Sequence, residues 1–137
     1  MHCDIKPDNL LFGLRQGVHL IDFGKAVKYE KFDQNTGMKN HIPNIKRWFL
    51  GNDCWSSKYV IEENTHSRRD DIITLIYSLV YLSNEYVNIL EVSERVKFFS
   101  DSTPKKFCSN GAEQLAPLLE EAYKTKFEEK PRYYKLK

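Results

Sequence analysis

Residues 67–82 have the sequence SRRDDIITLIYSLVYL, which is apolar almost all round from Asp71 onward. Ser67 can cap a helix, with Asp70 three residues later as its reciprocal partner. The stretch therefore predicts a helix over about residues 68–83, and a helix that is apolar on every face belongs at the buried centre of a fold. A fully buried strand is the alternative, but the run exceeds the usual length of a strand.

The flanking segments predict shorter elements. Residues 89–100 fit a shorter helix, and apolar residues recur at helical spacing over 112–123. Residues 10–12 and 18–21 are short apolar runs around a glycine-bounded turn, which predicts two strands. Residues 29–58 have no sustained period, so a long irregular segment is expected there. The expected fold class is mainly α with a small β-hairpin.

Composition limits the class of protein. The chain has 137 residues, which suits one domain or part of one, and its apolar fraction of 41% can build a core. Lys and Arg number 21 against 19 Asp and Glu, a net charge of +2. Glu128 and Glu129 interrupt the basic residues near the C-terminus. We therefore expect no nucleic-acid partner.

The spacing of the cysteines and the length of the apolar runs indicate the cellular compartment of the protein. Cys3, Cys54 and Cys108 are odd in number and widely spaced, which suggests neither a disulfide framework nor a zinc site. No apolar run approaches the ~18 residues that cross a bilayer. These features predict a reduced intracellular location, in the cytoplasm or nucleus, without a membrane partner.

Two short stretches carry residues suited to chemistry. Residues 2–11 read HCDIKPDNLL, and residues 22–24 read Asp-Phe-Gly at the end of the second predicted strand. The first places a carboxylate, a lysine and an amide on one loop, and the hairpin returns a second carboxylate beside them. Phosphoryl transfer needs such groups, because it requires an oriented hydroxyl, a cation on the moving phosphoryl and oxygen ligands for magnesium.

These two stretches resemble the catalytic loop HRDxKxxN and the DFG motif of protein kinases. The resemblance implies that Asp4 is the catalytic base and that Lys6 neutralises the transferred phosphoryl. It makes Asn9 and Asp22 ligands of Mg²⁺ and Leu11 the floor of the adenine pocket. ATP and Mg²⁺ are the implied cofactors, and a protein is the implied substrate.

Further stretches resemble the casein kinase 1 group. Residues 67–71 (SRRDD) are similar to the start of its central helix, residues 127–131 (FEEKP) to its FDDKP, and residues 51–57 (GNDCWSS) to its GTARYAS. The resemblance implies that Asp71 holds the backbone amides of the catalytic loop. It makes residues 1–137 a partial kinase domain, the C-terminal lobe of the α+β kinase fold: catalytic loop 2–11, DFG 22–24, activation and substrate segment 25–58, central helix about 68–83 and C-terminal helices 89–127.

Some parts of the kinase pattern have no counterpart. Cys3 replaces the arginine of HRD, so switching by a phosphorylated activation loop is not expected. Only Met1 precedes His2, so we expect the N-terminal lobe to be absent. Without it, an apolar face of the central helix that includes Ile72, Ile76 and Leu79 would lack a cover, which predicts a protein partner there.

Two functions remain open. The first is a serine/threonine protein kinase of casein kinase 1 type, present as a C-terminal lobe fragment that is expected to be inactive alone. The second is a truncated pseudokinase that acts as a protein-binding module. An in-frame glycine-rich loop and strand lysine upstream of Met1 would favour the first.

The tryptophans and the remaining histidines each allow a structural and a functional interpretation. Trp48 and Trp55 could pack against the central helix or bind a peptide, with packing favoured. His19, His41 and His66 are expected to be surface or capping residues rather than ligands.

Overall fold

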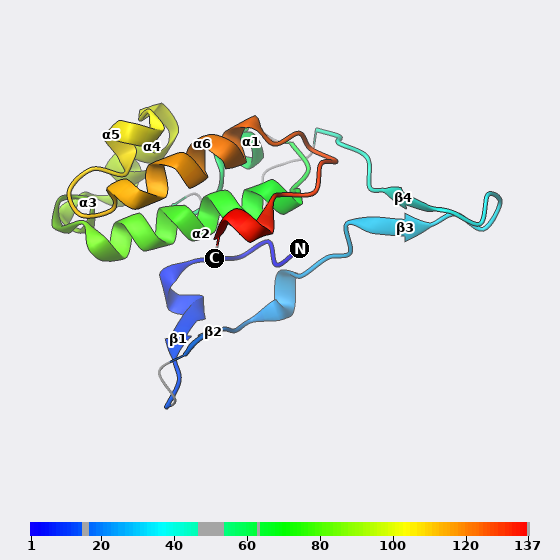
Figure 1. Ribbon diagram of the computed structural model, residues 1–137, viewed down its shortest axis with the longest axis horizontal. Coiled ribbons are helices and arrows are strands. Elements are labelled where there is room, and N and C mark those ends of the chain that lie inside the picture. The colour runs from blue at the N-terminus through cyan, green and yellow to red at the C-terminus, as the bar shows by residue number, and fades with distance from the viewer. Residues whose placement is uncertain (15–16, 47–53, 63, 137) are drawn as a thin grey trace.

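A computed structural model of the chain describes residues 1–14, 17–46, 54–62 and 64–136. Over these residues the protein is mainly helical, with two small antiparallel hairpins. Figure 1 shows the helices gathered in one body, from which the hairpins extend in different directions. The longer helices are α2 (Arg68–Ser83), α4 (Val92–Asp101) and α6 (Ala116–Lys124), and the shorter ones are α1 (Lys58–Ile61), α3 (Glu85–Ile89) and α5 (Pro104–Phe107). No helix among the described residues could span a membrane.

Helix α2 has the bounds that its sequence predicts, and its first turn explains why it starts at Arg68. The backbone N–H and the hydroxyl of Ser67 both donate to one carboxylate oxygen of Asp70, each over 2.7 Å. The same carboxylate accepts a hydrogen bond of 2.6 Å from the Ser57 hydroxyl. Asp70 is fully buried and tolerates burial because these donors satisfy it.

One side of α2 forms the centre of the core. Ile73, Ile76, Tyr77 and Val80 follow the spacing of three and four residues that marks a single helix face, and each is at most 2% exposed. Helix α6 packs against α2. The Tyr77 ring stacks on Phe99 of α4 at a centroid distance of 4.8 Å. The other members of the core are Val87, Phe99, Phe107, Cys108, Ala112, Leu119 and Ala122.

The prediction of an uncovered face on α2 is wrong for Ile76. This residue belongs to the core, and Ile72 packs partly buried against it. Leu79 and Leu82 are the exposed apolar residues of the helix, at 38% and 54%. The sequence alone could not orient α2, because a helix apolar on every side has no preferred buried face.

The first hairpin is confirmed. Strands β1 (Leu10–Phe12) and β2 (Val18–Leu20) pair antiparallel, with Leu11 opposite His19. Phe12, at 88%, and Val18, at 60%, expose most of their side chains. The hairpin therefore contributes little to the core, and Figure 1 shows it extending away from the helices.

The prediction that residues 29–58 are irregular throughout is wrong. Strands β3 (Glu30–Phe32) and β4 (Lys39–His41) form a second antiparallel hairpin. Its turn is set by the Asp33 carboxylate, which accepts hydrogen bonds from the N–H groups of Asn35 and Thr36, and by Gly37 at a φ of 67°. These strands lack the apolar alternation that marks a strand in sequence.

Trp55 supports the packing interpretation of the two tryptophans. Its ring lies edge-on to Tyr81 of α2 at 4.9 Å and tilted against Phe99 of α4 at 5.7 Å. Trp48 lies outside the described residues.

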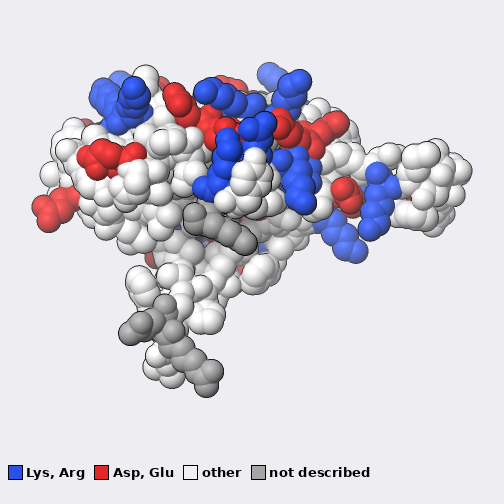
Figure 2. All heavy atoms as spheres, viewed as in Figure 1, with Lys and Arg blue, Asp and Glu red and all other residues white. Residues whose placement is uncertain are grey.

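Figure 2 shows Lys and Arg side chains intermixed with Asp and Glu on one side of the helical body. Glu121 of α6 pairs with Arg132 at 3.3 Å and with Lys135 at 3.1 Å. These two ion pairs partly neutralise the charge of the basic C-terminal residues, as is typical of basic residues exposed to solvent.

Candidate active site

The loop that contains Asp4 is fastened to the start of α2 by one carboxylate. Asp71 accepts hydrogen bonds from the backbone N–H of His2 over 2.8 Å and from that of Cys3 over 2.9 Å. This is the role that the resemblance implies for Asp71. Cys3 has a φ of 65°, so the chain turns sharply at this residue before it reaches Asp4.

His66 is a third partner of Asp71. Its Nε2 donates to the same carboxylate over 2.9 Å. Burial alone would raise the pKa of Asp71, but the hydrogen bonds from His66 and the two backbone amides outweigh it and lower the pKa below the ordinary value. The carboxylate is therefore charged at neutral pH. The helix cap is Ser67 rather than His66, whose side chain contacts the Asp71 side chain instead.

Replacing Asp71 with asparagine is expected to cost about 1–3 kcal/mol of unfolding free energy at pH 7, as for hydrogen bonds to a charged group. The folded-state pKa of Asp71 lies below the ordinary value of 3.8. Its contribution is therefore complete above the unfolded-state pKa and is lost as the pH falls through the folded-state pKa. Urea unfolding in a chelating buffer, between about pH 7 and pH 3, measures this.

The exposed Asp101 at the end of α4 supplies the control. Asp101→Asn should follow the wild type at every pH. A difference between Asp71→Asn and the wild type that grows toward low pH would contradict the role given to this carboxylate.

The Asp4 carboxylate is mostly buried, because only 8% of the side chain is exposed. The Lys25 ammonium lies 3.1 Å from one carboxylate oxygen, and the Lys6 ammonium lies 3.8 Å from the other. Two cations thus balance this anion. The sequence singles out Lys6, whereas Lys25 emerges only from the structure, because its contact depends on how the hairpin returns the chain.

Asn9 joins the loop to the hairpin. It ends the short 3₁₀ turn Pro7–Asn9 and is 5% exposed. Its side-chain N–H donates to the Asp4 carbonyl over 2.8 Å, and its own carbonyl accepts from the Ile21 N–H over 3.0 Å. Its amide oxygen, the atom that the kinase resemblance assigns to Mg²⁺, is not used in the bond to Asp4.

Asp22 directly follows Ile21, the residue whose N–H donates to Asn9. It adopts a left-handed backbone with φ 62° and ψ 73°, and one carboxylate oxygen accepts a hydrogen bond of 3.2 Å from Gly24. Asp22 is exposed, so its second oxygen can reach an ion. The donor set of Asn9 and Asp22, an amide oxygen and a carboxylate, fits the hard ligands that Mg²⁺ prefers.

His2 and Phe23 link the loop to the segment after β2. The His2 Nε2 contacts the Ile21 carbonyl over 3.0 Å, and its ring lies edge-on to Phe23 at 4.8 Å. Leu11 lies further along β1 and is 48% exposed. The structure thus brings Asp4, Lys6 and Asn9 into direct contact and Asp22 to the adjoining turn, whereas Leu11 opens to the surface.

Cys3 sits beside this site with an unreactive thiol. Burial, followed by the negative charge of Asp71, raises its pKa to about 12. The thiol is therefore protonated at neutral pH and is a poor nucleophile.

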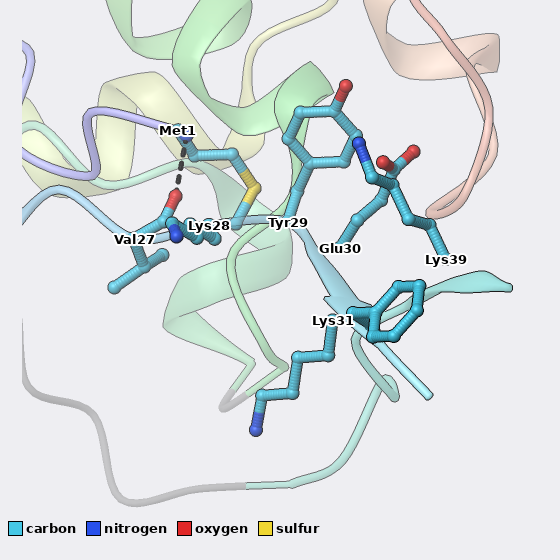
Figure 3. Close-up of a pocket in the computed structure, with 8 residues that line it drawn as sticks. Met1, Val27, Lys28, Tyr29, Glu30, Lys31 and Lys39 are labelled. Carbon is cyan, nitrogen blue, oxygen red and sulfur yellow. Dashed lines mark hydrogen bonds between the residues drawn. The ribbon is translucent and has the colours of Figure 1, made fainter. Parts of the chain in front are cut away.

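Two of the hollows lined by described residues lie next to the loop. The smaller, of about 400 Å³, is lined by residues that include His2, Phe23 and Ala26. The larger, of about 960 Å³, is lined by Met1, Val27, Lys28, Tyr29, Glu30, Lys31, Phe32 and Lys39. Figure 3 shows the residues that line this larger hollow, with the Lys39 side chain extending toward Tyr29 and the Lys31 side chain extending away from it. None of the five predicted site residues lines either hollow.

No family model matches the chain. A probable casein kinase I homolog of Encephalitozoon cuniculi is 28% identical over 149 aligned positions, which include 97% of this chain and 44% of that protein. The chain thus spans less than half the length of this relative. The similarity supports a relationship between this chain and the protein kinases.

Proposed function

We propose that this chain forms the C-terminal part of a serine/threonine protein kinase of casein kinase 1 type. The observation that carries the proposal is the enclosed carboxylate of Asp4. It lies on a loop fastened to α2 through Asp71 and is flanked by two lysines. A carboxylate held in place beside cations is what positioning an acceptor hydroxyl requires.

In the proposed reaction Asp4 accepts the proton of a serine or threonine hydroxyl. The hydroxyl oxygen forms a bond to the γ-phosphorus of ATP while the bond to the bridging oxygen breaks, which gives a phosphoprotein and ADP. Lys6 balances the charge on the moving phosphoryl, and Asn9 and Asp22 are the proposed ligands of Mg²⁺. The ion supplies charge neutralisation at the phosphates when it is bound.

The proposed nucleotide site is open on one side. Leu11, the proposed floor of the adenine pocket, is 48% exposed. A second wall would have to come from another part of a longer polypeptide or from a partner chain. We therefore propose that the described residues bind Mg-ATP weakly by themselves.

A second candidate is a protein-binding module without catalysis. The first hairpin favours it, because Phe12, Leu14 and Val18 are at least 60% exposed. Apolar side chains gathered on one projecting element are typical of a docking surface. Both candidates can use this surface, since a partner that covers it could also complete the nucleotide site.

The two candidates are tested by phosphoryl transfer from γ-labelled ATP. The chain is assayed within the full polypeptide that carries it, with Mg²⁺ and a mixture of serine, threonine and tyrosine peptides. We expect label on serine or threonine, and its loss when EDTA removes Mg²⁺. Absence of transfer in a folded protein that binds a partner would favour the binding module, and label on tyrosine alone would contradict the serine/threonine assignment.

A further inference from the structure

Three side chains with different metal-binding atoms meet beside the loop that carries Asp4. The Cys3 sulfur, one imidazole nitrogen of His66 and one carboxylate oxygen of Asp71 all lie within 4.8 Å of one another. They come from the N-terminal segment, from the residue before the Ser67 cap, and from the first turn of α2. All three residues are partly buried rather than on the open surface.

We propose that Cys3, His66 and Asp71 form a binding site for a zinc ion. The proposal concerns binding only and stands independently of the kinase assignment.

The His66–Asp71 contact already has nearly the spacing of two ligands on one ion. The nitrogen and the oxygen are 2.9 Å apart. Zinc binds imidazole nitrogen at about 2.0–2.1 Å and carboxylate oxygen at about 2.0–2.2 Å, so two tetrahedral ligands lie about 3.3 Å from each other. An ion can therefore replace the shared proton with a shift of a few tenths of an ångström. The displaced proton moves to Nδ1, so the imidazole that binds the ion through Nε2 is the neutral tautomer.

Two backbone amides hold the Asp71 carboxylate in place. Its two oxygens accept the backbone N–H groups of His2 and Cys3 over 2.8 and 2.9 Å. Hydrogen bonds of this kind orient a ligating carboxylate and reduce the ordering that binding requires. The amide at Cys3 belongs to the residue that supplies the sulfur, so one carboxylate fixes the backbone from which the third ligand projects.

The ligand set favours zinc over magnesium. A thiolate and an imidazole are the soft and intermediate donors that zinc prefers, whereas magnesium takes oxygen ligands. Binding displaces the thiol proton to the buffer, and a water molecule completes four-coordination. The sequence did not suggest such a site, because its ligands are separated by more than sixty residues.

The test uses Cd²⁺ as an optical probe on the tag-free chain after treatment with a chelator. Cadmium bound to a thiolate gives a charge-transfer absorption in the ultraviolet. We expect one Cd²⁺ per chain, displaced by Zn²⁺, and the loss of this absorption in Cys3→Ser. His66→Gln should weaken Cd²⁺ binding at least tenfold, because even the loss of a group that only orients a ligand costs about 10–100-fold. Cys54→Ser and His19→Gln are the matched controls and should bind as the wild type does.

Several outcomes would overturn the proposal. They are an absorption that survives in Cys3→Ser, an unchanged affinity in His66→Gln, or no saturable binding by the folded wild type. Circular dichroism establishes that each variant is folded. If Cys3→Ser fails to fold, the ¹¹³Cd NMR shift of the wild type decides, because it reports whether the ion has one sulfur ligand. None of these readouts requires ATP, so a failure here is distinguishable from a failure of the proposed kinase function.

Discussion

Replacing Asp70 with alanine is expected to remove about 3–5 kcal/mol of unfolding free energy. The Asp70 carboxylate is fully buried and accepts three hydrogen bonds, from the Ser57 hydroxyl and from the N–H and hydroxyl of Ser67. Its removal leaves these buried donors without their acceptor and a cavity at the start of α2. Domains of this size are stable by about 5–15 kcal/mol, so this loss is a large share of the total stability.

Urea unfolding followed by circular dichroism measures the loss. Asp101→Ala, at an exposed position in α4, should stay within about 0.5 kcal/mol of the wild type. Ser57→Ala removes one of the donors and should therefore cost much less than Asp70→Ala. The double variant should cost less than the sum of the two, because the residues share one network. An Asp70→Ala protein as stable as Asp101→Ala would contradict this account of the helix start.

Replacing Asp4 with asparagine is expected to lower the proposed phosphoryl transfer by about 10²–10⁴-fold. The amide keeps nearly the shape of the carboxylate but cannot accept the hydroxyl proton. It also removes the charge that Lys25 and Lys6 balance at 3.1 and 3.8 Å. Initial rates of label transfer at saturating Mg-ATP, measured in the full polypeptide, give the effect on kcat.

Asp8→Asn provides the control, because Asp8 is exposed in the neighbouring 3₁₀ turn. Its rate should be within about twofold of the wild type. Melting curves of both variants separate a chemical effect from unfolding. If Asp4→Asn keeps more than a tenth of the wild-type rate, Asp4 is not the base.

Local signals in the sequence were sufficient for α2 and the first hairpin. The Ser67 and Asp70 pair marks the start of α2, and the glycines around residues 13–17 mark the hairpin turn. The helix expected over 89–100 begins three residues later, at Val92, and α6 covers most of the stretch expected over 112–123. Capping and turn residues act over a few positions, which is why the sequence alone identifies them.

Long-range packing was the part that the sequence could not supply. The buried position of Ile76 depends on which side of α2 the later helices cover. The second hairpin was missed for a local reason, because its strands lack the apolar alternation that marks a strand in sequence. In the candidate site, the contact of Lys25 with Asp4 joins two segments whose approach no local pattern encodes.

The hydrogen bonds of the first turn of α2 also affect the order in which parts of the chain fold. Asp71 holds residues 2 and 3, while Arg68 and Arg69 donate to the carbonyls of Glu128 and Thr125. These links close long loops and so form late, whereas the aromatic core around Tyr77 joins segments that are closer in the chain. The amides of α2 should therefore exchange with solvent only on global unfolding, whereas those of β1 and β2 should exchange through local opening. The loop that carries Asp4 would then dissociate from α2 and rebind without unfolding of the core.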